Sequence, residues 1–170
     1  MAQTVGIGHQ DFETIRKEGY FYIDKTKFIC KWWQSGDSVT LIARPRRFGK
    51  TLNMSMLEKF FSVKYAGRGE LFEGLYIWQE EEYRRLQGIY PVISLSFANI
   101  KETTFLNARK KICRIIRNLY NQYDFLTESG KLNADEKKFC QDISVDMDDD
   151  IATDSLNVLT NCLWKYYGKK

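Results

Sequence analysis

The chain has 170 residues, of which 44% are hydrophobic and 15% aromatic, and a formal net charge of +4. This length and composition predict one globular domain with its own core and exclude a disordered chain. The modest positive charge permits contact with phosphates but does not by itself indicate a nucleic-acid-binding protein.

The histidine and cysteine content and the hydropathy of the chain exclude further classes of protein. His9 is the only histidine, so a zinc site or a histidine-based catalytic triad has almost no side chains to build on. The four cysteines show no CxxC spacing, which predicts free thiols in a reducing compartment. The N-terminus lacks the apolar core of a signal peptide, and no apolar run approaches membrane-spanning length. We therefore expect a cytoplasmic protein without membrane contact.

Residues 1–38 form a leader ahead of the central motif. The segment 11–16 predicts a short helix with Phe12 and Ile15 on one face, and residues 25–33 predict a second helix that Asp24 could cap. The apolar run 39–43 predicts a strand buried on both faces of a sheet.

A basic loop follows that strand and leads into a helix at Gly49-Lys50-Thr51. A strand, a tight loop and a helix N-terminus in this order are typical of a phosphate-binding P-loop. We expect Lys50 to reach the β- and γ-phosphates and the Thr51 hydroxyl to ligate Mg²⁺, which makes these two the candidate catalytic residues. The predicted nucleotide-binding residues are Arg44, Pro45, Arg46, Arg47, Phe48, Gly49, Lys50 and Thr51.

The motif departs from the full Walker A pattern at one position, because Arg44 stands where that pattern has its first glycine. An ordinary strand-to-helix turn that happens to contain Gly-Lys-Thr is the alternative interpretation. Arg46 and Arg47 could contact phosphate oxygens, act as arginine fingers on a neighbouring subunit, or form a solvated basic turn.

The rest of the chain predicts helices and one more strand. Pro91 introduces the apolar strand 92–97, and helices are expected over 104–123, 134–143 and 154–167, the last with Asp154 as N-cap and Gly168 as its stop. The first of these helices should face the core with Ile112, Ile115, Ile116 and Leu119. The acidic cluster 146–150 lacks the glycine and the closing glutamate of a calcium-binding EF-hand, which favours a solvated loop. The helix over 104–123 carries a basic face that could touch nucleic acid or simply be its wet side; its residues are Arg109, Lys110, Lys111, Arg114 and Arg117.

With these residues placed, the chain resembles the AAA-ATPase-like domain of bacterial proteins that often carry a C-terminal nuclease-like domain of the PD-(D/E)xK type. Four pieces in order carry the resemblance, and the run from Arg44 to Thr51 is the most specific of them. They are Asp11-Phe12-Glu13-x-Ile15-Arg16, Tyr22-Ile23-Asp24-Lys25-Thr26, Arg44-Pro45-Arg46-Arg47-Phe48-Gly49-Lys50-Thr51, and Leu71-Phe72-x-Gly74-Leu75 with Tyr90-Pro91-Val92-Ile93. In that family an arginine at the position of Arg44 is the usual form.

The resemblance implies an α/β, P-loop NTPase-like fold, here an incomplete parallel sheet flanked by helices, that binds ATP with Mg²⁺. It also implies that the protein could form a homo-oligomer. Contact with nucleic acid would come through a C-terminal nuclease-like domain that is absent here. Family members continue into a Walker B strand, whereas this chain ends at Lys169-Lys170. We therefore expect residues 1–170 to be the N-terminal part of an AAA-ATPase-like P-loop domain, divided into 1–38, 39–62 and 63–170, a fragment that binds nucleotide and hydrolyses it poorly.

Two other functions compete with this one. The chain could be a non-enzymatic fragment that binds nucleic acid or a partner through the basic helix face and the Arg46-Arg47 loop. A small-molecule P-loop kinase is the third hypothesis, although no lid or acceptor-binding carboxylate is recognisable.

Overall fold

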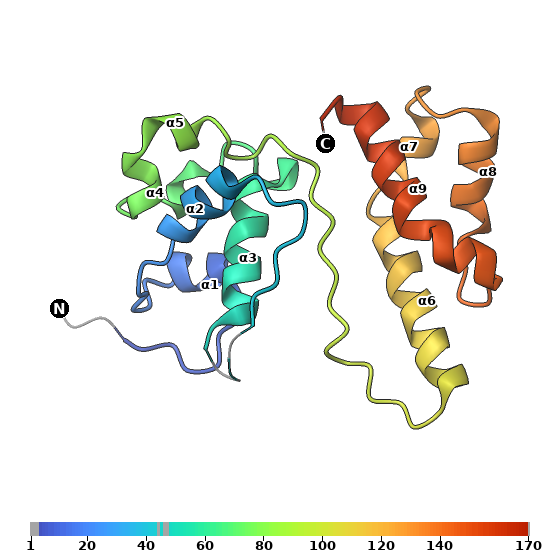
Figure 1. Ribbon diagram of the computed structural model, residues 1–170, viewed down its shortest axis with the longest axis horizontal. Coiled ribbons are helices and arrows are strands. Elements are labelled where there is room, and N and C mark those ends of the chain that lie inside the picture. The colour runs from blue at the N-terminus through green and yellow to red at the C-terminus, as the bar shows by residue number, and fades with distance from the viewer. Residues whose placement is uncertain (1–3, 44, 46–47, 170) are drawn as a thin grey trace. The chain divides into compact units, whose positions relative to one another are not determined.

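The computed structural model describes residues 4–43, 45 and 48–169, and its regular structure in those residues is helical (Figure 1). The chain divides into two compact units, Met1–Val92 and Ile93–Lys170. The helices of the first unit are α1 (Phe12–Lys17), α2 (Lys27–Ser35), α3 (Lys50–Phe61), α4 (Tyr76–Gln79) and α5 (Glu81–Arg84), with 3₁₀ turns η1 (Val63–Tyr65) and η2 (Gly69–Leu71). Those of the second unit are α6 (Phe105–Asn121), α7 (Phe125–Glu128), α8 (Ala134–Asp142) and α9 (Asp149–Tyr167).

Helix α1 is fixed at both ends by side chains. Asp11 is its N-cap and accepts a hydrogen bond from the Thr14 backbone N–H at 2.9 Å, which satisfies one donor of the first turn. Arg16, in its last turn, donates from Nε to the Leu71 carbonyl at 2.8 Å. As the sequence predicts, Phe12 and Ile15 are buried.

The core of the first unit is aromatic. Phe60 on α3 packs edge-to-face against Phe72, with ring centroids 5.1 Å apart, and Phe12 also stacks on Phe72 at 5.1 Å. All three side chains are fully buried. Edge-to-face and offset pairs of this kind add to the free energy gained from burying apolar area, so these rings fix α1 and α3 against the segment that follows η2.

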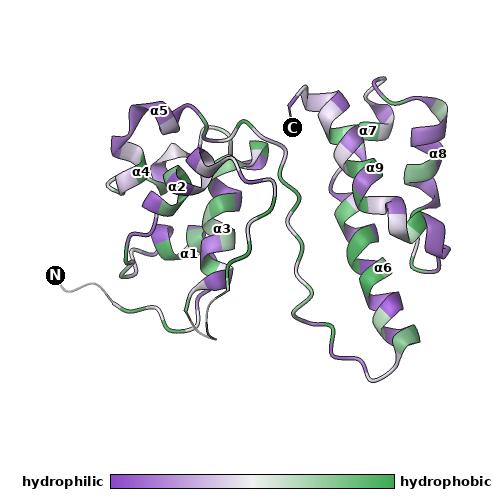
Figure 2. Ribbon diagram, in the orientation of Figure 1, coloured by the Kyte–Doolittle hydropathy of each residue, from purple (hydrophilic) through white to green (hydrophobic). Residues whose placement is uncertain are grey.

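The second unit is a small helical bundle with a separate core. Figure 2 shows apolar residues recurring along α6 and α9 between polar ones, as expected for helices that each bury one side. The buried Tyr120 hydroxyl of α6 donates to the Ser155 carbonyl of α9 at 2.6 Å. The core comprises Cys113, Ile116, Leu119, Tyr120, Tyr123, Leu126, Leu132, Ile143, Met147, Leu159, Cys162 and Leu163.

The predicted α/β fold with a parallel sheet is wrong for the residues that the structure describes. Neither 39–43 nor 92–97 forms a strand, and the β-structure of the described residues is one isolated parallel bridge between Ser62 and Tyr90. Val39 and Leu41 are 84% and 87% exposed, so the first run is not buried on both faces. A strand exists only when a neighbour accepts its backbone hydrogen bonds, and an apolar run does not reveal whether that neighbour is present.

The last helix begins earlier than the sequence predicts. Asp148, not Asp154, is the N-cap of α9 and accepts from the Ile151 backbone N–H at 2.8 Å. Asp149 and Asp150 therefore lie in its first turn, where carboxylates favour the positive end of the helix dipole. The predicted stop is confirmed, because Gly168 is the C-cap of α9 in the left-handed conformation.

Candidate functional site

The predicted transition from loop to helix lies at the N-terminus of α3. Gly49 is its N-cap and takes the left-handed conformation, with φ 73° and ψ 24°, which glycine adopts at little cost. Lys50 and Thr51 are the first two residues of α3, and both are exposed. The first backbone bond of the helix runs from the Asn53 N–H to the Gly49 carbonyl at 2.9 Å. The helix thus begins where the sequence predicts.

The first turn of α3 has the character of an anion-binding terminus. It contains no acidic residue, and its N-cap, Gly49, has no side chain that could cap it. The first N–H groups of a helix lack intrahelical acceptors and carry the positive end of its dipole, so they favour a negatively charged ligand.

The remaining predicted nucleotide-binding residues are only partly described. Arg44, Arg46 and Arg47 lie outside the described residues. Pro45 and Phe48 are both exposed. The geometry available for this site is therefore that of Gly49 and the start of α3.

A buried acceptor lies one turn into the same helix. Asn53 is only 5% exposed, and its Oδ1 has no hydrogen-bond partner among the residues that the structure describes. Buried side-chain oxygens are nearly always paired, because leaving one unpaired costs free energy. Asn53 is therefore an unsatisfied polar group in the interior of the first unit.

The Asp24-Lys25-Thr26 motif has a role that the sequence does not reveal. Asp24 Oδ2 accepts from the Tyr76 backbone N–H at 2.7 Å, and the fully buried Thr26 hydroxyl accepts from the Ile77 N–H at 3.1 Å. Asp24 Oδ1 also accepts from the Thr26 hydroxyl at 2.6 Å. The two side chains therefore cap α4 from about fifty residues away, a contact that no local pattern could predict.

Three residues of the basic face of the second unit lie beside carboxylates of the same unit, two of which belong to the acidic cluster. Arg109 donates to the Asp149 carboxylate with Nε at 2.7 Å, and Lys111 forms an ion pair with Glu102. Lys110 lies 3.9 Å from the Asp146 carboxylate. In the part of the chain that is described, no group of three histidine, cysteine, aspartate or glutamate side chains could hold a metal ion.

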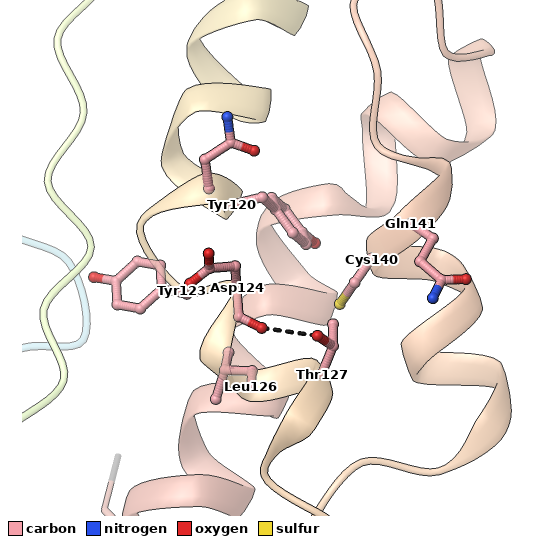
Figure 3. A pocket seen from close by; sticks show the side chains of 8 residues that line it. Tyr120, Tyr123, Asp124, Leu126, Thr127, Cys140 and Gln141 are labelled. Carbon is pink, nitrogen blue, oxygen red and sulfur yellow. Dashed lines mark hydrogen bonds between the residues drawn. The ribbon is translucent and has the colours of Figure 1, made fainter.

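A small pocket lies between α6, α7 and α8. Figure 3 shows the Tyr120 ring and the Cys140 sulfur directed toward the same space, with Thr127 Oγ1 donating to the Asp124 carbonyl at 2.8 Å. Its volume of about 100 Å³ is well below the range of about 300–1,000 Å³ typical of small-molecule sites. It is too small for a nucleotide, so we interpret it as a packing gap.

Comparison with known proteins adds to this geometry. Over 92 residues the chain is 38% identical to a protein of Azotobacter chroococcum mcd 1 described as "Uncharacterized protein in vnfD 5'region". That alignment covers 54% of this chain and 16% of the relative, so the chain spans a small part of the relative's length. No solved structure matches the chain. Among the described residues, none of the helices has the length and apolar content that crossing a bilayer requires.

The match to a family model covers nearly the whole chain. The model is that of the AAA-ATPase-like family, described as predicted AAA-ATPases, and it extends over residues 6–169. It therefore includes the Gly49 end of α3, the Asp24 motif and the helices α6 to α9 of the second unit. The chain belongs to the AAA-ATPase-like family.

Proposed function

We propose that the chain binds the phosphates of ATP, with Mg²⁺, at the Walker A-like segment from Arg44 to Thr51. The observation that carries the proposal is the left-handed Gly49 directly before a helix whose first turn has no acidic residue. Family membership as a predicted AAA-ATPase supports the same ligand.

The proposal assigns separate tasks to the backbone of the helix start, to Lys50, to Thr51 and to the three arginines. The backbone N–H groups at the start of α3 would donate to phosphate oxygens, and Lys50 would neutralise charge on the β- and γ-phosphates. The Thr51 hydroxyl would be a ligand of Mg²⁺, and the ion would neutralise the negative charge that accumulates on the phosphates during transfer. Arg44, Arg46 and Arg47 would add positive charge around the same ligand.

Binding of nucleic acid through the basic face of α6 has less support. Arg109 and Lys111 are engaged by carboxylates of the same chain, and Lys110 lies near another. A phosphate backbone would have to displace these carboxylates, which reduces the gain in free energy from each contact. Oligomerisation, contact with nucleic acid through a nuclease-like domain and a cytoplasmic location stay predictions from the resemblance and the sequence.

The test is binding of a fluorescent ATP analogue in the presence of Mg²⁺. Hydrogen bonds to charged groups contribute about 1.5–3 kcal/mol, so Lys50→Ala should weaken binding about 10- to 150-fold. Lys31→Ala, which removes an exposed lysine of α2, is the matched control and should bind like the wild type. Phosphate release, measured in parallel, distinguishes a nucleotide-binding domain from an active ATPase.

The outcome against the proposal is equally clear. A folded wild-type chain that does not bind the analogue would overturn it. Binding that survives Lys50→Ala but responds steeply to salt and to added DNA would favour the nucleic-acid alternative.

A further inference from the structure

The turn that precedes α2 is held unusually firmly for a segment with exposed residues. Asp24 Oδ1 accepts from both the backbone N–H and the hydroxyl of Thr26, at 2.8 and 2.6 Å. The other Asp24 oxygen and the Thr26 hydroxyl accept from the first two N–H groups of α4. Because both neighbours of Lys25 are anchored to a second helix, the backbone of Lys25 has a defined position.

The side chain of Lys25 reaches the N-terminus of α3. A Cβ atom added to Gly49 would lie 3.3 Å from Lys25 Nζ, so the ammonium group occupies the space beside this glycine. Lys25 comes from the turn before α2, whereas Gly49 is the N-cap of α3. Two segments separated in sequence thus bring a cation to the end of the helix where an anion is favoured.

This arrangement is electrostatically unfavourable without a ligand. The N-terminus of a helix carries partial positive charge, and a cation placed there is repelled. Among the described residues no ion pair joins Lys25 to a carboxylate that would compensate for this repulsion, and the first turn of α3 has no acidic residue. An anion bound between the helix end and Lys25 would relieve it.

We propose that Lys25 is a second phosphate-binding cation of this site, donating from Nζ to an oxygen of the polyphosphate chain of a nucleotide. The inference rests on the proposed function, because it assigns a new residue to the same ligand. In it Asp24 and Thr26 are positioning residues that act on the ligand only through Lys25. Gly49 permits the left-handed cap, and its missing side chain leaves room for the Lys25 ammonium.

The experiment compares three variants in the same assay with the ATP analogue and Mg²⁺. Lys25→Gln should weaken binding about tenfold or more, and Lys25→Arg, which keeps the charge, should recover most of it. Lys27→Gln is the matched control: it removes the same charge two residues away, from an exposed lysine whose ammonium lies 5.3 Å from the centre of the Tyr76 ring. It should change the dissociation constant less than twofold.

A second readout separates a ligand contact from a structural role. Without nucleotide, Lys25→Gln should melt at the temperature of the wild type or slightly above it, because repulsion at the helix end is reduced. The inference would be overturned if Lys25→Gln destabilised the free protein and weakened binding only as much as that loss of stability explains. Inorganic pyrophosphate should raise the melting temperature of the wild type more than that of Lys25→Gln.

The outcomes for this inference and for the proposed function can be told apart. If Lys50→Ala abolishes binding while Lys25→Gln binds like the wild type, the inference is wrong and the proposed function stands. If the folded wild type binds no analogue, both are wrong.

Discussion

The Asp11 carboxylate of the α1 cap lies 2.8 Å from Lys59 Nζ in the last turn of α3. Partial burial alone would raise the pKa of Asp11, but hydrogen bonds from Lys59, Thr14 and Ser55 outweigh that effect and lower the pKa to about 2. The Lys59 side chain is only 9% exposed, whereas that of Asp11 is 44% exposed. The pair therefore joins two helices of the first unit at the edge of its core.

We predict that Asp11→Asn lowers stability at neutral pH and makes it less dependent on pH. Asparagine still caps a helix, so the loss of about 1–2 kcal/mol would come mainly from the charge facing Lys59. A carboxyl with a lowered pKa in the folded state stabilises fully above its unfolded value of 3.8 and loses that contribution as the pH falls toward about 2. Urea unfolding at several pH values should show wild type and variant converging near about pH 2. If the difference in unfolding free energy between wild type and variant were the same at about pH 2 as at about pH 6, the prediction would be wrong.

Thr26→Val should destabilise the chain although the two side chains have nearly the same shape. The substitution removes the acceptor for the Ile77 N–H in a fully buried place, which we expect to cost about 1–3 kcal/mol. Thr26→Ser is the control, because it keeps the hydroxyl and loses one methyl group. The denaturant midpoint should be highest for the wild type, lower for Thr26→Ser and lowest for Thr26→Val. If the valine variant were as stable as the serine variant, the hydrogen bond to the Ile77 N–H would not contribute to stability.

Gly88→Ala should be more harmful than an equivalent change at Gly67. Both glycines have positive φ, 71° and 76°, so alanine costs about 1–2 kcal/mol of backbone strain at either position. A Cβ at Gly88 would also lie 2.5 Å from the Ala66 Cα, while one at Gly67 would meet no atom within 4 Å. The melting temperature should therefore fall further for Gly88→Ala. Equal effects of the two substitutions would show that the contact with Ala66 relaxes freely.

Among the four cysteines, we expect Cys140 alone to react quickly with a thiol reagent in the folded protein. Cys30, Cys113 and Cys162 are at most 6% exposed, whereas Cys140 is only partly buried. A hydrogen bond with the Cys162 thiol lowers the pKa of Cys140, which raises its thiolate fraction near neutral pH. Titration with a chromogenic disulfide should find one fast thiol, lost in Cys140→Ser, and four after unfolding. Several fast thiols in the native state would contradict the burial of Cys30, Cys113 and Cys162.

Much of the helical structure could be predicted from local patterns. Thr104 begins α6 as its N-cap, and Ile116 and Leu119 are buried on the predicted face, since caps and helical periodicity depend on nearby residues. Ile112 belongs to the same predicted face but is 37% exposed, because helical spacing does not say how much of the face a neighbour covers. The wrong strands have a related cause: whether Val39 and Leu41 are paired depends on segments far away in the sequence.

The candidate site divides in the same way. The helix start at Lys50 follows from a local motif and is confirmed. The position of Lys25 beside Gly49 could not be predicted, because it depends on Asp24 and Thr26 binding the end of α4. The signal in the sequence is the motif Asp24-Lys25-Thr26 itself, in which a lysine stands between two side chains that can accept backbone hydrogen bonds.

The bonds that Arg16 and Asp24 make with partners 52 to 57 residues downstream also constrain the order of events during synthesis. Helices α1 and α2 have six and nine residues, and isolated helices of that length are marginal in water. At about 5–20 residues per second, the ribosome needs about 3–10 s to deliver the segment that holds them. During that interval the nascent chain exposes Phe12 and Ile29, which makes the unfinished first unit a natural client for a chaperone that shields apolar side chains.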